Sequence, residues 1–80
     1  MNEYGLNKRM LKSIMVANGD TSKDMCEYLH ISTASVSLKM NGHSPFSLKE
    51  ISALVQRYDL TPEQVYAIFF EVMVTTLVTE

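Results

Sequence analysis

The sequence predicts an all-α fold: a compact domain of five short helices, with almost nothing that reads as a strand before the C-terminal tail. Apolar residues recur at helical spacing, capping residues stand where the helices begin, and only a few residues separate consecutive helices. Helices joined by such short connections must pack as neighbours in one bundle. The chain has 80 residues, of which 46% are hydrophobic, so it is expected to form a single domain with one core.

The first helix is expected from about Tyr4 to Asn18, because Asn18-Gly19 is a typical helix end. Its buried stripe would comprise Leu6, Met10, Leu11 and Ile14. The second helix opens at the sequence TSKD, where Thr21 can cap and Asp24 stands at the third helical position. Met25 and Leu29 would form its buried edge.

The third helix is expected within HISTASVSLKMNGHSPF, residues 30–46. Ser32 can cap it, Val36 and Met40 lie one turn apart, and Asn41-Gly42 ends it. The remaining side chains are small and mostly carry hydroxyl groups, so they can contribute little to a core. Either this segment is a solvated connector, or it is a helix that lets something bulky approach closely.

The last two helices have complete start signals. The sequence SLKE is a capping box from Ser47 to Glu50, and it precedes a stripe at helical spacing: Leu48, Ile51, Leu54, Val55 and Tyr58. The sequence TPEQ offers Thr61 as the cap, Pro62 at the first helical position and Gln64 at the third.

Composition narrows the class of protein. One cysteine, Cys26, cannot form an intramolecular disulfide, and no charged leader precedes an apolar stretch, so a cytoplasmic protein is expected. The formal net charge is −2, but residues 1–49 hold six Lys/Arg and four Asp/Glu, whereas residues 50–80 hold one and five. This asymmetry permits a basic face that binds DNA.

The second and third helices form the informative pair. The turn between them is so short that it fixes a steep angle, leaving the outer face of the third helix free. Val36 and Met40 would hold this helix down, while Thr33, Ala34, Ser35, Ser37 and Leu38 face outward. Small side chains allow a helix to enter a DNA major groove, where hydroxyls and methyl groups can meet base edges.

The segment TSKDMCEYLHISTASVSLKMNGHSPFSLKEISALVQRYDLTPEQVY resembles the helix-turn-helix domain of Cro/CI-type phage repressors, the XRE or lambda-repressor-like family of transcriptional regulators. The resemblance runs from about Leu6 to Phe70 and is most specific at the turn of residues 29–32, at SLKMNG and at TPEQVYAIFF. It implies a five-helix fold with the third helix as the recognition helix. His30 stands where the family usually has Gly in a left-handed backbone conformation.

The resemblance also implies site residues, by position. The base contacts would be Thr33, Ala34, Ser35, Ser37 and Leu38. The phosphate contacts would be Ser22, Lys23, Lys39, Asn41 and His43. Ser22 is shorter than the Gln that the family often carries there.

Nothing in the chain predicts catalysis or a cofactor. No Ser/His/Asp arrangement or glycine-rich phosphate loop occurs, so we expect no enzymatic activity. His30 and His43 lack further ligands at metal-binding spacing, and Cys26 is best interpreted as a core residue. We expect no metal, no cofactor, no small-molecule ligand and no membrane partner.

The tail VYAIFFEVMVTTLVTE is too apolar for one helix face. Two stripes can be read: Val65, Ile68, Phe69 and Val72 on one side, and Tyr66, Phe70 and Met73 on the other. The second stripe predicts a homodimer interface, because one small domain has only one core. The last residues are rich in β-branched side chains and could form a strand or continue the helix.

These observations divide the chain into a helix-turn-helix DNA-binding domain, residues 1–70, and a C-terminal tail for dimerisation, residues 71–80. The expected function is that of a dimeric, Cro-like transcriptional regulator of phage or prophage type that binds an inverted-repeat DNA operator. The alternative is a protein-interaction module, such as an antirepressor or adaptor, that keeps the fold without specific DNA binding.

Overall fold

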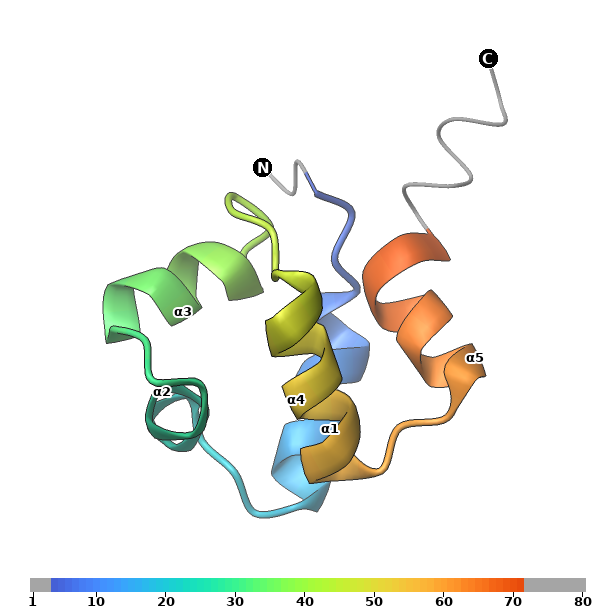
Figure 1. The fold of residues 1–80 in the computed structure, drawn as a ribbon, viewed down its shortest axis with the longest axis horizontal. Helices are drawn as coiled ribbons and strands as arrows, with labels where there is room; N and C mark the ends of the chain where they lie inside the picture. Colours follow the sequence, from blue (N-terminus) through green and yellow to red (C-terminus); the bar gives the residue numbers. More distant parts are fainter. Residues whose placement is uncertain (1–3, 72–80) are drawn as a thin grey trace.

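The computed structural model describes residues 4–71 of the 80-residue chain. Within them the fold is all-helical and contains no strand, as predicted (Figure 1). The fifth helix starts as an α-helix and continues directly into a π-helix. In chain order the elements are α1 (Lys8–Ala17), α2 (Ser22–Leu29), α3 (Thr33–Met40), α4 (Leu48–Tyr58), α5 (Pro62–Val65) and the π-helix η1 (Tyr66–Phe70).

The predicted start signals are all present as hydrogen bonds. Thr21, Ser47 and Thr61 each accept a hydrogen bond from the backbone N–H three residues on, and each closes a reciprocal capping box. Ser32 caps α3 by accepting from the N–H of Ser35 at 3.1 Å. Because a cap satisfies backbone donors locally, these helix starts depend little on tertiary contacts.

The first helix begins later than predicted. Asn7, not Tyr4, precedes it, and the Asn7 side chain accepts a hydrogen bond from the N–H of Met10 at 3.1 Å. The expectation of a helix from Tyr4 was therefore wrong. Gly5 adopts a positive φ of 65°, which turns the chain, and Leu6 reaches the core from outside the helix.

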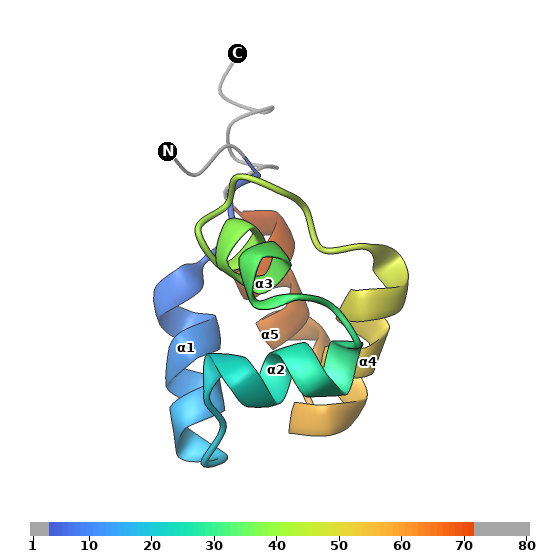
Figure 2. The same cartoon turned by 90° about the vertical axis from the view of Figure 1, so that its left-hand side faces the viewer.

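The centre of the core is built from four side chains, one from each of four helices. Each has no exposed surface; they are Leu11, Met25, Leu54 and Ile68, from α1, α2, α4 and η1. Figures 1 and 2 show these helices surrounding a common interior, with α3 lying on one side of it. Cys26 is buried with a free thiol, and Met25 and Met40 are buried as predicted, whereas Met10 is half-buried.

Leu48 does not belong to the core, contrary to the predicted stripe on α4. It is 81% exposed at the first position of the helix, whereas Leu54 and Tyr58 of the same stripe are buried. The aromatic ring of Phe46 closes this end of the core instead, edge-on to Phe69 with ring centroids 5.6 Å apart. The stripe therefore starts at Ile51.

The end of the last helix differs from the two stripes predicted for it. The N–H of Glu71 bonds to the carbonyl of Tyr66, five residues back, which is the wider turn of a π-helix. Phe69 is buried and Phe70 is half-buried against the core, so Phe70 does not lie on an exposed stripe with Tyr66. Val72, Met73 and the predicted strand or helix of the tail lie outside the described residues.

A polar link joins the α1–α2 connection to the C-terminal end of α4. Asp20 accepts hydrogen bonds from Nε and Nη2 of Arg57 at 2.6 and 2.8 Å, and from the Tyr58 hydroxyl at 2.6 Å. The Arg57 guanidinium also lies 4.7 Å from the ring centroid of Tyr28 on α2. The hydrogen bonds from Arg57 and then from Tyr58 lower the pKa of the Asp20 carboxyl below its ordinary value of 3.8.

Replacing Asp20 with Asn should lower the free energy of unfolding at pH 7 by about 1–2 kcal/mol, because hydrogen bonds to a charged group are lost. A carboxyl whose pKa is lowered in the folded state stabilises it above the ordinary pKa, and this contribution disappears as the pH falls. The difference between the native protein and Asp20→Asn should therefore shrink below about pH 4. Urea unfolding of both proteins at several pH values measures this difference in the free energy of unfolding.

Glu27→Gln is the matched control. Glu27 is exposed on α2, so this substitution removes one carboxylate without changing the link between Asp20, Arg57 and Tyr58. It should change stability little at either pH. A difference between native protein and Asp20→Asn that stays constant from pH 7 to pH 3 would show that the charge of Asp20 does not act as described.

Candidate nucleic-acid interface

The position of α3 follows from a left-handed residue in the turn before it. His30 ends α2 with φ 58° and ψ 43°, and the N–H groups of His30 and Ile31 both bond to the carbonyl of Cys26. These two hydrogen bonds to one carbonyl close the end of α2, and the chain changes direction within three residues. The left-handed conformation expected at His30 is thus confirmed.

Helix α3 is held down on one face only. Val36 and Met40, one turn apart, are 2% and 6% exposed, as predicted. Of the five predicted base-contact residues, Ser35 is half-buried and its hydroxyl accepts a hydrogen bond from Ser32 at 3.0 Å. The other four are exposed: Thr33, Ala34, Ser37 and Leu38. The small hydroxyl-rich segment is therefore a helix with a free outer surface.

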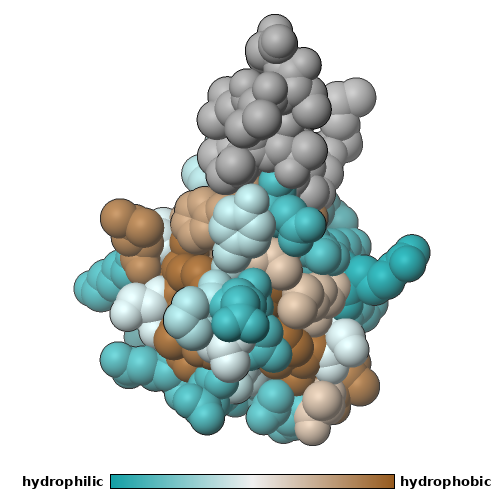
Figure 3. All heavy atoms as spheres, turned by 90° about the vertical axis from the view of Figure 1, so that its right-hand side faces the viewer, coloured by the Kyte–Doolittle hydropathy of each residue, from teal (hydrophilic) through white to brown (hydrophobic). Residues whose placement is uncertain are grey.

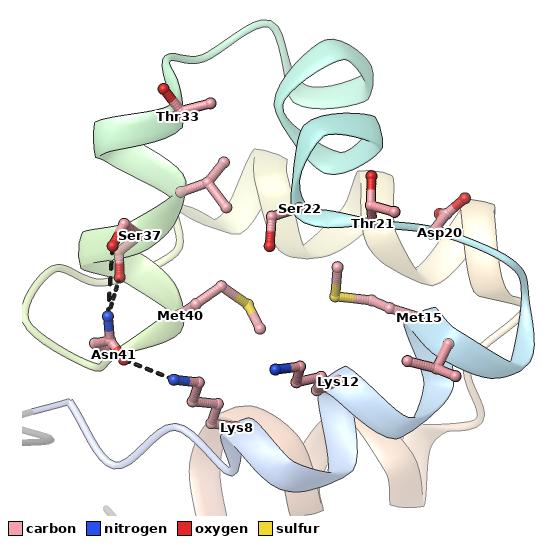
Figure 4. A pocket seen from close by; sticks show the side chains of 12 residues that line it. Lys8, Lys12, Met15, Asp20, Thr21, Ser22, Thr33, Ser37, Met40 and Asn41 are labelled. Carbon is pink, nitrogen blue, oxygen red and sulfur yellow. Dashed lines mark hydrogen bonds between the residues drawn. The ribbon is translucent and has the colours of Figure 1, made fainter.

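The structure brings some of the predicted residues together around a groove of about 410 Å³ (Figure 4). The groove lies between α1, the start of α2 and α3. Four predicted site residues line it: Ser22, Thr33, Ser37 and Asn41. The other predicted contacts lie elsewhere, and among them Ala34, Leu38, Lys23 and His43 are exposed.

Two lysines of α1 were missed by the sequence reasoning. Lys8 and Lys12 line the same groove, and Figure 4 shows both side chains reaching toward it from below α3. The Lys8 ammonium donates a hydrogen bond to Oδ1 of Asn41 at 2.7 Å. Their i, i+4 spacing could have shown that they share a helix side, but nothing in the sequence shows that this side faces α3.

Lys39, predicted to contact a DNA phosphate, is engaged by a carboxylate of α4. Its Nζ lies 2.6 Å from Oε1 of Glu50, and the two side chains are only 15% and 14% exposed. Burial alone would raise the pKa of the Glu50 carboxyl, but the hydrogen bonds from Lys39 and Ser47 outweigh it and lower the pKa. At neutral pH this pair is ionised and carries no net charge, so Lys39 is a poor candidate for a phosphate contact.

The groove is consequently bordered by positive charge. Asp20 also lines it, but the Arg57 guanidinium balances that carboxylate. The start of α2 adds no further positive charge, because the Asp24 carboxylate already accepts hydrogen bonds there from the N–H and the hydroxyl of Thr21, at 2.7 and 2.9 Å. An anion approaching between α1 and α3 would meet two ammonium groups and exposed hydroxyls.

The chain matches the family model of the BetR domain over residues 7–70. The match begins at Asn7, which caps α1, and ends at Phe70, the last residue of η1. It therefore covers all five helices. The chain belongs to the BetR domain family.

Comparisons of this BetR domain with curated proteins and with solved structures gave no match. No helix within residues 4–71 is long and apolar enough to cross a membrane. The same residues contain no cluster of three or more His, Cys, Asp or Glu side chains that could hold a metal ion.

Replacing His30 with Gly should raise the free energy of unfolding by about 0.5–1 kcal/mol. A left-handed backbone is costly for a residue with a Cβ and costs glycine almost nothing. Chemical unfolding monitored by circular dichroism measures the change. His30→Ala is the control, because it removes the imidazole but keeps the Cβ.

If His30→Ala stabilised the domain as much as His30→Gly, the imidazole rather than the backbone would be the source of strain. A destabilised His30→Gly would show that the imidazole makes a contact that the turn depends on.

Proposed function

We propose that this protein is a DNA-binding transcriptional regulator whose helix α3 enters the major groove of an operator. The observation that carries the proposal is the juxtaposition at α3: a helix with a free, small, hydroxyl-bearing surface, next to the start of α2 and two lysines of α1. Small exposed side chains suit base edges, and the lysines suit the flanking phosphates.

The roles we assign follow the exposure of each residue. Base contacts are proposed for Thr33, Ala34, Ser37 and Leu38, with Ser35 contributing only at the start of the helix. Phosphate contacts are proposed for Ser22, Lys23, Asn41 and His43, joined by Lys8 and Lys12. Lys39 is left out because Glu50 neutralises it.

The resemblance to Cro/CI-type repressors supports this proposal and extends it. A regulator of that kind binds an inverted-repeat operator as a homodimer, so that two recognition helices lie about one DNA turn apart. We propose the same for this chain, acting without catalysis or a cofactor in a bacterial cytoplasm or a phage-infected cell. DNA binding should then fall steeply with salt concentration.

A second function is favoured by particular side chains. Leu38 and Leu48 are 50% and 81% exposed, which suits a protein partner better than a phosphate backbone. The alternative proposal is therefore a protein-interaction module that keeps the helix-turn-helix fold, such as an antirepressor or adaptor.

The decisive experiment is a pull-down of sheared genomic DNA from the source organism with the purified 80-residue chain, followed by sequencing. Enrichment of a short inverted repeat beside a promoter is the result expected of a regulator. Absence of enrichment by a folded protein would overturn the DNA proposal and favour the interaction module.

Ser37→Glu should weaken operator binding on the order of a hundredfold or more, because a carboxylate on the exposed side of α3 would face the DNA. Its melting temperature should barely change, since Ser37 is exposed. Ser52→Glu adds the same charge to the exposed surface of α4 and should bind DNA normally. Fluorescence anisotropy with the recovered operator compares the three proteins.

Equal binding by Ser37→Glu and the native protein would remove α3 from the interface. A large loss of stability in Ser37→Glu would show that this side of α3 is packed rather than free.

The proposed dimer is best tested at Tyr66, which is 44% exposed. Figure 3 shows apolar atoms scattered among polar ones on the face that carries α5, rather than one continuous patch. Phe70 is a poorer probe, because its ring packs against the core, 6.4 Å from that of Phe69. Tyr66→Asp should shift the chain toward monomers in sedimentation velocity, because it places a charge in the proposed apolar interface.

Leu48→Asp is the matched control for association. It places the same charge on a more exposed apolar residue, at the start of α4, and should leave the sedimentation coefficient unchanged. If Tyr66→Asp sediments as the native protein does, the dimer does not form through this part of the chain.

A further inference from the structure

The groove between α1 and α3 has a property that DNA binding alone does not call for: its floor is apolar. Met15 and Met40 line it from opposite sides, and Figure 4 shows their thioether ends pointing toward each other across it. Val36 lines it from α3, and Val16, which is 67% exposed, forms its outer edge on α1. A volume of about 410 Å³ lies within the range of sites for small molecules.

Charge is concentrated on one border of this apolar floor. The Lys8 ammonium is already bonded to Asn41 at 2.7 Å. The Lys12 ammonium makes no hydrogen bond or ion pair with any residue from 4 to 71. Asp20, the carboxylate on the lining, already accepts three hydrogen bonds from Arg57 and Tyr58. A single negative charge on a ligand would thus find Lys12 available, and the carboxylate on the lining, Asp20, is already compensated.

We propose that this groove binds a small amphipathic anion, with one acidic head group and a short unbranched apolar tail. The head group lies between Lys12 and Lys8, and the tail lies over the two methionines toward Val16. Methionine suits such a floor because its unbranched, polarisable side chain adapts to the shape of an apolar ligand. This departs from the sequence-based expectation of no small-molecule ligand.

Such a ligand would share its site with the DNA backbone. Thr33, Ser37 and Asn41 border the groove and also belong to the DNA-facing side of α3. A molecule seated there would obstruct the approach of a phosphate to Lys12, and it would act as an inducer that releases the operator. This regulatory consequence rests on the proposed function, whereas binding itself does not.

Octanoate, used below its micelle-forming concentration, is the probe for the first experiment. It is titrated into the isotope-labelled 80-residue chain without DNA, and backbone amide chemical shifts are followed by NMR. Saturable shifts are expected in α1, at the start of α2 and in α3. Shifts spread over the whole domain, or none at all, would overturn the proposal.

Two further ligands separate the contributions of head and tail. Acetate carries the head group with almost no tail, and octyltrimethylammonium carries an alkyl tail of nearly the same length with the opposite charge. Both should bind at least tenfold more weakly than octanoate. Equal binding of acetate would leave only an anion site, and equal binding of the cation would leave only a non-selective apolar surface. Either result would overturn the proposal.

Lys12→Gln should weaken octanoate binding about fivefold, because one charge-assisted contact is lost. Lys49→Gln removes an equivalent exposed ammonium from α4 and should bind octanoate as the native chain does. Both substitutions are on the surface, so the fold is retained and can be checked in the same spectra. Equal affinities for the two variants would exclude the head-group position that we propose.

The regulatory consequence has a separate test. Octanoate added to the complex of the chain with its operator should release DNA in proportion to groove occupancy, and Lys49→Gln should respond as the native chain does. Octanoate binding to a chain that binds no DNA would refute the proposed function but leave the groove ligand standing. Loss of DNA binding in Lys12→Gln, with no octanoate binding to the native chain, would mean that the groove serves phosphate alone.

Discussion

The fold depends on four side chains that converge at one point from four different helices. Leu11, Met25, Leu54 and Ile68 have no exposed surface, and each can leave water only if the other three do so. Their burial fixes the positions of α1, α2, α4 and η1 relative to one another. Helix α3 joins the same core through Val36, which is also almost completely buried, and through Met40. The opposite side of α3, with Thr33, Ala34, Ser37 and Leu38, stays exposed.

The direction of α3 is also set by what lies at its two ends. The left-handed His30 sets its start, and at its end the N–H of His43 bonds to the carbonyl of Leu38 at 2.9 Å. The Asp20–Arg57–Tyr58 link acts earlier in the chain. It ties the connection between α1 and α2 to the end of α4, and so helps to hold α2 and α4 in place before the turn at His30. The hydroxyl of Tyr28 adds a bond from α2 to the carbonyl of Ala53 on α4, at 3.0 Å. Polar contacts around α3 thus help to orient it, in addition to the burial of Val36 and Met40.

The sequence predicts best what is decided within a few residues. The caps at Thr21, Ser32, Ser47 and Thr61 satisfy backbone groups three residues away, and the starts of four helices follow from them.

Prediction from the sequence fails where the partner of a residue is distant in the chain. The exposure of Leu48 depends on which aromatic ring closes the core, and the neutralisation of Lys39 depends on Glu50, eleven residues on. Lys8 and Asn41, 33 residues apart, could not have been assigned to one groove from spacing alone. The candidate site was therefore predicted on α3, where the signal is local, and missed on α1.

The distribution of paired and unpaired charge decides what this domain can attract. A net charge of −2 argues against nucleic acid only if every charge counts equally. Arg57 and Lys39, each engaged by a carboxylate, contribute little beyond their own partners. Lys8 and Lys12 lie beside α3 on a groove whose lining carboxylate, Asp20, is already balanced. The groove thus presents two lysines although the whole chain is acidic, and lysines alone do not distinguish one anion from another. Only the surface beneath the anion can do so: the hydroxyls of α3 suit a nucleic acid lying across the groove, and the two methionines suit a short apolar tail lying within it. Both ligands would need the same lysines, so occupation by one must weaken the other.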